Sequence, residues 1–206
     1  IICDLKYGTG EASEIAPRQV LINIIELLKE ENLKAIVAPE LEFYLCEQNL
    51  DPDLPLKTPV GKSGRRETGS RVFGIDAVNE FDALTDDIYD YCELMEIGVD
   101  TLVHESGPSQ IEINLNHGDP LALADQAFMF KRAVRQVALK HGIHATFMAK
   151  PYQGQPGSSM HIHQNLVSTK TNKNLFSDQE GNNSREFLNY IGAVSYTHLR
   201  AHETSI

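Results

Sequence analysis

The chain has 206 residues, of which 41% are apolar and 23% charged, the balance of an ordinary globular protein long enough for a core of its own. Its 29 acidic and 18 basic residues give a formal net charge of −11, which argues against nucleic-acid binding through a broad basic surface. No apolar run reaches the ~18 residues of a membrane-spanning helix, so no membrane is expected among its partners.

The first part of the chain alternates helix and strand patterns. Residues 17–31 repeat apolar side chains at helical spacing after a proline, which predicts a helix. Residues 34–45 predict a strand, and residues 47–71, rich in Pro, Gly, Lys and Arg, predict a loop. Residues 82–97 predict a second helix, which Gly98 ends.

The second part of the chain adds shorter apolar runs, with Asp119-Pro120 as a strong helix start. Strands with links that permit antiparallel pairing, and helices interleaved on one side, indicate an α+β fold with a mainly antiparallel sheet or half-barrel. The predicted elements here are strands at residues 101–104 and 110–116, a helix at 119–141, strands at 144–150 and 159–167, and a helix from about residue 185.

Three of these strands carry chemistry-bearing side chains on one face. Alternate residues of a strand point to the same side, so Glu40 and Glu42 share a face, as do His161 and His163. Residues 110–116 alternate apolar side chains with Gln, Glu and Asn, and Glu105 lies just upstream. Buried carboxylates and imidazoles need partners, because leaving them unpaired is costly.

Each pattern alone also has a simpler interpretation. A Glu-x-Glu pair or an alternating strand is typical of a solvated sheet face, and paired histidines also occur as hydrogen-bonded core residues. Together the patterns favour strands that line one polar cavity. Carboxylates that outnumber imidazoles favour hard ions such as Mg²⁺ or Mn²⁺ over Zn²⁺.

Four sequence motifs follow one another along the chain. They are Pro39-Glu40-Leu41-Glu42-Phe43, His104-Glu105 followed by Gln110-Ile111-Glu112, Ala145-Thr146-Phe147-Met148-Ala149-Lys150-Pro151, and Gly157-Ser158-Ser159-Met160-His161-Ile162-His163. In this order and at this spacing they resemble the catalytic domain of the glutamine synthetase family over residues 1 to about 194. We therefore expect residues 1–194 to be part of a glutamine-synthetase-type catalytic domain with its helices on the outer side of the sheet.

The resemblance implies a role for each matching residue, with ATP and two or more Mg²⁺ or Mn²⁺ sites. Glu42, Glu105 and Glu112 match the ligands of a metal beside the amino-acid substrate. Glu40 and His161 match ligands of the metal at the nucleotide phosphates, and His161 also falls at the substrate. The remaining matches are His163 and Asn165 at ATP, Asp100 more loosely near the nucleotide, and Gly157 in the glutamate-binding loop.

The implied reaction is ATP-dependent ligation of the glutamate γ-carboxylate to an amine or ammonium through γ-glutamyl phosphate. Pro156 stands where the ammonia-using enzymes carry an asparagine, and it offers neither a side-chain amide nor a backbone N–H. The Pro-Gly-Ser-Ser-Met-His form is closer to the branch that joins glutamate to putrescine and other polyamines. The alternatives are a strict glutamate–ammonia ligase, a non-catalytic structural member of the fold and an unrelated metal-dependent hydrolase.

The resemblance also predicts that the chain is incomplete. The family carries a small domain before this region and an arginine-rich segment after it, where the catalytic residues are expected, so we expect the isolated chain to be inactive. The full-length parent is expected to form a ring-shaped homo-oligomer. Residues 195–206 resemble a translated adapter, a non-native tail that interrupts the helix from residue 185, and its His198 and His202 are not expected to bind metal.

The cysteines bear on the compartment. Cys3, Cys46 and Cys92 are odd in number, widely spaced and without a Cys-x-x-Cys motif. This pattern is typical of reduced thiols, so a cytoplasmic protein is expected.

Overall fold

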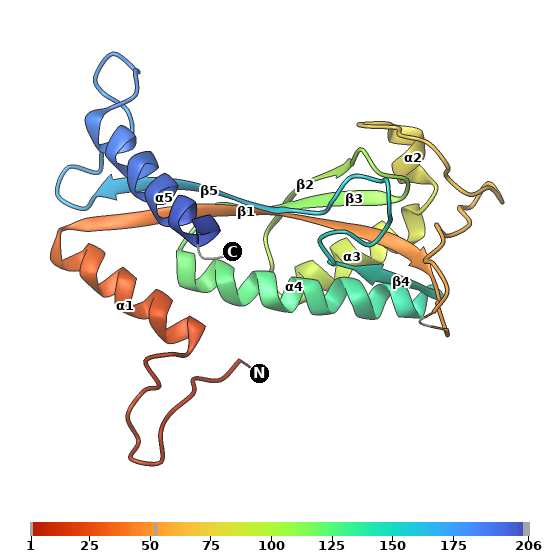
Figure 1. The fold of residues 1–206 in the computed structure, drawn as a ribbon, viewed down its shortest axis with the longest axis horizontal. Coiled ribbons are helices and arrows are strands. Elements are labelled where there is room, and N and C mark those ends of the chain that lie inside the picture. Colours follow the sequence, from red (N-terminus) through yellow and green to blue (C-terminus); the bar gives the residue numbers. More distant parts are fainter. Residues whose placement is uncertain (1, 52, 204–206) are drawn as a thin grey trace. The chain divides into compact units, whose positions relative to one another are not determined.

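The computed structural model describes residues 2–51 and 53–203, with side chains up to residue 197, so His198 and His202 lie outside the described side chains. Five helices and five strands follow one another along this part of the chain (Figure 1). In chain order they are α1 (Pro17–Glu30), β1 (Leu33–Glu47), α2 (Ile75–Asn79), α3 (Asp82–Leu94), β2 (Val99–His104), β3 (Gln110–Leu115), α4 (Pro120–Lys140), β4 (Ile143–Thr146), β5 (Met160–Ser168) and α5 (Arg185–Glu203).

The chain divides into two compact units, and two strands run through both. The first unit comprises residues 1–37, 119–121 and 164–206, and the second comprises residues 38–118 and 122–163. The boundary crosses β1 after Val37 and β5 after His163. Each unit is described by itself below.

The second unit is built on an open, antiparallel sheet in the order β2–β3–β1–β4, with β5 pairing to β1 as well. β1 pairs with β3 along one edge, from Glu40 opposite Asn114 to Tyr44 opposite Gln110. Its other edge pairs with β4, from Tyr44 opposite Thr146 to Glu47 opposite Ile143. The predicted α+β class with a mainly antiparallel sheet is therefore confirmed.

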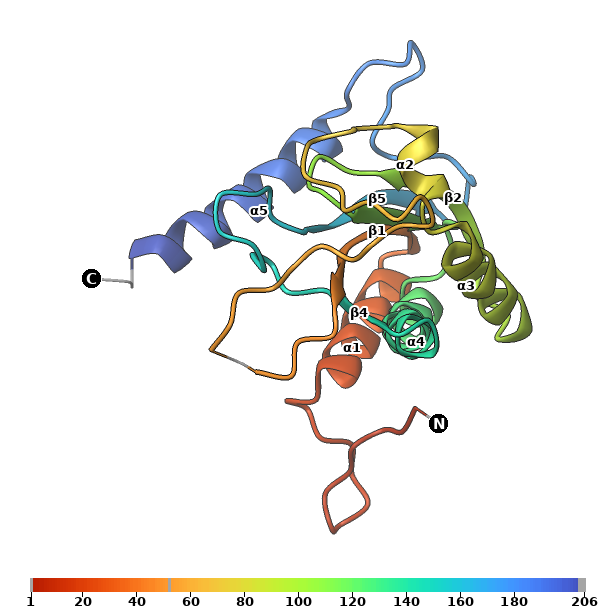
Figure 2. The same cartoon turned by 90° about the vertical axis from the view of Figure 1, so that its right-hand side faces the viewer.

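The two faces of this sheet differ sharply in chemistry. Alternate residues of β1 and β3 form an apolar face that is almost fully buried, and α3 and α4 cover it (Figures 1 and 2). An aromatic contact ties this face to α4, because the Phe147 ring lies 5.2 Å from that of Phe43 and 6.4 Å from that of Phe130. The sheet's members of this core are Leu41, Phe43, Leu45, Ile111, Ile113 and Leu115.

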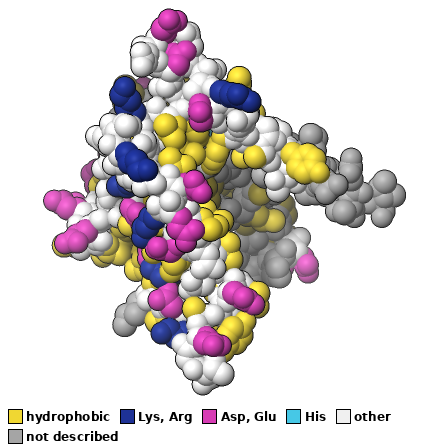
Figure 3. All heavy atoms as spheres, turned by 90° about the vertical axis from the view of Figure 1, so that its left-hand side faces the viewer, with side chains coloured by type: hydrophobic (Ala, Val, Ile, Leu, Met, Phe, Trp, Pro, Cys, Tyr) yellow, Lys and Arg dark blue, Asp and Glu magenta, His cyan; other side chains and the backbone are white. Residues whose placement is uncertain are grey.

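The first unit has far less core. None of the residues of α1 is buried, and Val20, Ile24 and Leu27 on its apolar side are each about half exposed. Helix α5 likewise exposes Leu188 and Ile191. On the face drawn in Figure 3, acidic and basic side chains are interspersed with such apolar atoms rather than gathered into one charged patch.

Some predicted elements differ from the observed ones. The helix α2 was not predicted; it follows Gly74 and buries Ala77. β4 ends at Thr146 instead of Lys150, because the Thr146 hydroxyl accepts the backbone N–H of Met148 and turns the chain. The expectation that residues 195–206 interrupt the last helix is wrong, since α5 continues to Glu203 with helix-compatible residues.

Candidate metal centre

The polar face of the sheet carries most of the residues that the sequence suggested as metal ligands. Glu42 on β1 lies directly opposite Glu112 on β3, so both carboxylates point to the same side. Gln110 opposite Tyr44 and Asn114 opposite Glu40 extend this face. The backbone N–H of Glu105 donates to the Gln110 carbonyl at 2.8 Å, which continues the pairing past the end of β2.

Three side chains converge at its centre. Glu40, Glu112 and His161 each offer one ligand atom, and these atoms lie within 4.8 Å of one another. His161 Nδ1 is 3.3 Å from Glu40 Oε2, and His163 Nε2 is 2.8 Å from Glu40 Oε1. Glu112 is 9% exposed whereas His161 is open to solvent, so the cluster has a buried base and an accessible side.

Among the described residues, the ion pairs of this cluster join Glu40 to His161 and His163, and none involves a Lys or Arg side chain. Burial, and then the charges of Glu40, Glu105 and Glu42, raise the pKa of Glu112 above its usual range. A bound cation would stabilise the ionised form of Glu112, which burial and the neighbouring carboxylates oppose. Carboxylate oxygens with one imidazole suit Mg²⁺ or Mn²⁺, so the donor set fits the metal that the resemblance implies.

Glu42 is fixed more firmly than its neighbours. Its carboxylate accepts the backbone N–H of Ser159 at 3.1 Å, the Ser159 hydroxyl, and the Gln110 side-chain amide at 3.1 Å. Glu105, by contrast, accepts only a 3.3 Å contact from the Ser106 N–H among the described hydrogen bonds. The cluster that meets most closely is Glu40, Glu112 and His161, so the division into one site of three glutamates and a second of Glu40 and His161 stays a prediction.

The other suggested residues lie in varied surroundings. His163 contacts Glu40 within the second unit. The Gly157 carbonyl accepts the Gln110 amide at 3.0 Å, and a side chain at Gly157 would come within 2.8 Å of the Ala149 carbonyl oxygen. Asn165 belongs to the first unit, where its side chain accepts the amide of Asn174 at 3.0 Å.

Asp100 lies by the helices instead of the cluster. It is exposed on β2, and after burial and Cys92 it is the next charge that raises the pKa of Tyr89 on α3. Nothing in this geometry connects it to the carboxylates, and its nucleotide role stays a prediction.

Three residues of the site were not assigned roles from sequence. Gln110 joins Glu42 to the Gly157 loop, and Ser159 holds the Glu42 carboxylate. Tyr44 donates its hydroxyl to the Pro156 carbonyl at 2.8 Å, and burial, then the charges of Glu42 and Glu105, raise its pKa to about 12. Their alternation with the assigned acids, at Glu42-x-Tyr44 and Gln110-x-Glu112, was the available signal.

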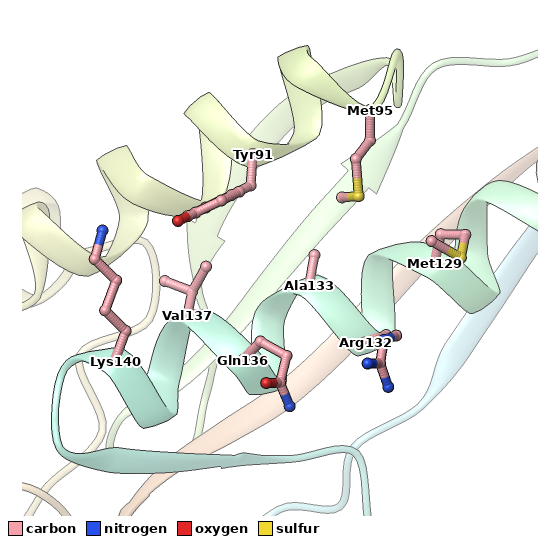
Figure 4. A pocket seen from close by; sticks show the side chains of 8 residues that line it. All are labelled: Tyr91, Met95, Met129, Arg132, Ala133, Gln136, Val137 and Lys140. Atoms are coloured by element: carbon pink, nitrogen blue, oxygen red, sulfur yellow. The ribbon is translucent and has the colours of Figure 1, made fainter. Parts of the chain in front are cut away.

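A separate apolar pocket of about 270 Å³ lies between α3 and α4 (Figure 4). Tyr91 on α3 and Met95 just after its end point toward it, and Ala133 and Val137 face it from α4. None of the carboxylates of the polar face lines it, so it is no part of the candidate centre.

Comparison with known proteins identifies the family. Residues 14–203 match the model of the glutamine synthetase catalytic domain. The chain is 40% identical over 177 residues to gamma-glutamylputrescine synthetase PuuA of Escherichia coli (strain K12), covering 85% of this chain and 37% of that protein. It is 34% identical over 188 residues to glutamine synthetase of Pyrococcus abyssi, covering 91% and 40% respectively.

A solved structure agrees with this result. Ligand-free GmaS superposes with a TM-score of 0.72 at 25% identity, covering 86% of this chain and 40% of GmaS. The chain therefore belongs to the glutamine synthetase family, whose members are ATP-dependent ligases. It spans about 40% of the length of the relatives it matches. Among the described helices, none combines the length and the apolarity needed to cross a bilayer.

Proposed function

We propose that the polar face of the sheet binds divalent cations and the phosphates of ATP in a ligase that joins the γ-carboxylate of glutamate to an amine. The observation that carries the proposal is the convergence of Glu40, Glu112 and His161, whose ligand atoms lie within 4.8 Å of one another. The raised pKa of Glu112 supports it, because a cation relieves the crowding of negative charge.

The residues of the chain supply binding and orientation. Bound Mg²⁺ or Mn²⁺ supplies charge neutralisation for phosphoryl transfer, a reaction that needs positioning more than covalent catalysis. Glu42, held by Ser159 and Gln110, enters this site with its carboxylate already oriented. Glu40 keeps His161 and His163 at the accessible side, where an anionic ligand would approach.

The amine is the finer part of the proposal. We infer an organic amine of the putrescine class, with γ-glutamyl phosphate as the activated form of glutamate. Pro156 cannot offer a side-chain amide to glutamate, and its carbonyl is held by the Tyr44 hydroxyl. The 40% identity to a protein named gamma-glutamylputrescine synthetase, against 34% to a glutamine synthetase, supports this choice.

A strict glutamate–ammonia ligase is the second candidate, favoured by the glutamine synthetase relatives themselves. The two candidates predict different amine preferences. The test compares kcat/KM for ammonium with kcat/KM for putrescine, ethanolamine and a simple monoamine, measured by ATP-dependent phosphate release with glutamate. The assay needs a protein that carries this domain at the full length of its relatives. A clear preference for ammonium would assign the protein to the second candidate and make Pro156 a neutral variation.

Assembly and compartment complete the proposal. We expect the full-length protein to form a ring-shaped homo-oligomer in the cytoplasm, with catalytic side chains beyond this chain. Size-exclusion chromatography with light scattering measures the assembly state. A monomer that turns over at ordinary enzyme rates would contradict the ring.

A further inference from the structure

Glu67 connects an otherwise peripheral loop to the back of the candidate metal centre. It comes from the segment between β1 and α2, yet its side chain is only 9% exposed. Its partner His104, at the end of β2, is 1% exposed. The loop itself is anchored there, because the Thr58 hydroxyl donates to the Glu67 carbonyl at 3.0 Å and the Phe73 N–H donates to the His104 carbonyl at 2.9 Å.

Hydrogen bonds hold both ring nitrogens of His104. His104 Nδ1 lies 2.8 Å from the Glu105 carbonyl oxygen, which only accepts, so Nδ1 carries a proton. His104 Nε2 lies 2.9 Å from Glu67 Oε2, which also accepts the backbone N–H of Ser109. One proton shared between His104 Nε2 and Glu67 Oε2 satisfies both of these buried groups.

The Glu67 carboxylate contacts both ends of the turn between β2 and β3, at His104 and at Ser109. Ser109 has a φ of 58°, a left-handed conformation that costs free energy for a residue other than glycine. The turn is closed by the Glu105 N–H to the Gln110 carbonyl and by the Gln110 N–H to the Gly107 carbonyl. Gly107 in turn lies against Tyr44, whose hydroxyl would be 1.9 Å from any added Cβ.

This turn carries two residues that face the metal cluster. Glu105 is one of the charges that raise the pKa of Glu112, after burial and Glu40. Gln110 donates from one amide nitrogen to Glu42 Oε2, to the Gly157 carbonyl and to the Ser158 hydroxyl at 3.0–3.3 Å. A shift of the turn would therefore displace Glu105 and loosen Glu42 together.

We propose that Glu67 is a positioning residue of the metal centre: through His104 and Ser109 it holds the 104–110 turn so that Glu105 and Gln110 are preorganised for a divalent cation. The inference rests on the proposed metal-binding function. Glu67 does not itself face the cluster, and it acts through the turn alone.

A contribution to stability alone explains the Glu67–His104 pair poorly. Glu67 Oε1 and the Ser109 hydroxyl are buried without a hydrogen-bond partner among the described atoms. Such groups reduce stability, and a buried ion pair is often replaceable by apolar side chains at no loss.

The test compares Mn²⁺ binding by wild-type chain and by Glu67→Gln, with Glu80→Gln as the matched control. Glu80 is a second carboxylate at this loop that accepts a backbone N–H, from Ser63 at 3.0 Å, but it does not contact the turn. Titration calorimetry is expected to show about tenfold weaker Mn²⁺ binding by Glu67→Gln, the lower end of the range for residues that orient metal ligands. Glu80→Gln is expected to bind like the wild type.

A loss of general stability needs its own control. Val134→Ala, buried on α4 away from the turn, lowers stability without touching the polar face. Unfolding in urea with EDTA measures each variant's stability, and Val134→Ala is expected to keep wild-type Mn²⁺ affinity while Glu67→Gln loses it. If Glu67→Gln does not fold, Glu67→Asp, which keeps the charge but shortens the reach, replaces it with the same expected direction.

The outcomes separate the two claims. Wild-type affinity in a folded Glu67 variant, or equal losses in the Glu67 and Val134 variants, overturns the positioning role and leaves the metal site standing. Failure of the wild-type chain to bind Mn²⁺ overturns both.

Discussion

The two faces of the central sheet are built from alternate residues of the same strands, yet one face is apolar and the other carries carboxylates. Leu41 and Phe43 on one face are at most 1% exposed and pack against the helix layer. Glu40 and Glu42, which alternate with them along the chain, turn toward a crowded cluster of carboxylates. Burial stabilises the first face, whereas burial on the second raises the pKa of Glu112 and opposes its charge.

The comparison suggests a division of labour within single strands. The apolar face supplies the free energy that keeps the strands rigid. The polar face uses that rigidity to hold like charges together, which is unfavourable without a cation. A buried carboxylate with a raised pKa, such as Glu112, is more typical of a functional site than of a structural one.

The largest expected effect on stability comes from the apolar face. Phe43→Ala removes a fully buried ring that touches Phe147, and we expect the free energy of unfolding to fall by about 3–5 kcal/mol. Urea denaturation in EDTA measures the change. The matched variant is Glu42→Gln, the adjacent residue on the opposite face, which should cost much less. Equal losses at both positions would remove the distinction between the faces.

The largest expected effect on binding comes from the polar face. Glu112→Gln removes a proposed ligand, so Mn²⁺ affinity should fall more than about 100-fold, beyond the range typical of residues that merely orient ligands. The same change removes like-charge repulsion, so the metal-free protein at neutral pH should not be destabilised. Calorimetry and thermal unfolding measure the two quantities.

The control for that variant is Glu93→Gln, an exposed acid of α3 with the same change in net charge. It should leave Mn²⁺ binding intact. Parallel losses in both variants would indicate a diffuse electrostatic attraction instead of a site.

A smaller effect tests whether the cysteines of β1 and α3 are shielded from solvent. Burial raises the pKa of Cys46, on β1, and of Cys92, on α3, to about 11 each, whereas Cys3 is exposed. Because only the thiolate reacts, a disulfide reagent at pH 8 should modify Cys3 quickly and the other two slowly. For the two buried thiols the rate should rise as the pH approaches 11, and urea should abolish the difference. Fast reaction of all three thiols in the native protein would contradict the burial of Cys46 and Cys92.

The two faces of the sheet and the bounds of two helices could be predicted from sequence, because the alternation of polar and apolar residues and the Pro and Gly signals are local. The period-two pattern at Glu40-Leu41-Glu42-Phe43 assigned faces correctly, and proline and glycine marked the bounds of α1 and α4 within a residue or two. The family resemblance, which supplied the fold class, depended on short motifs in order.

Other features depend on contacts between distant segments and leave no local signal. Glu67 lies in a loop with many charges, and nothing in that composition distinguishes the buried carboxylate from its exposed neighbours Arg65 and Arg66. The closeness of Glu112 to Glu40 and His161 depends on strand register, which one sequence does not specify. α5 continues to Glu203 although the composition of residues 195–203 differs from that of the chain before them, because a change in composition does not by itself end a helix.

The central claim is that the polar face is a divalent-metal centre, and anomalous scattering from a crystal of this chain soaked in Mn²⁺ tests it most directly. The account predicts a manganese peak between Glu40, Glu112 and His161, with carboxylate oxygens as ligands. Manganese bound only at exposed acids such as Asp86 and Asp90 of α3, with none among those three side chains, would contradict it.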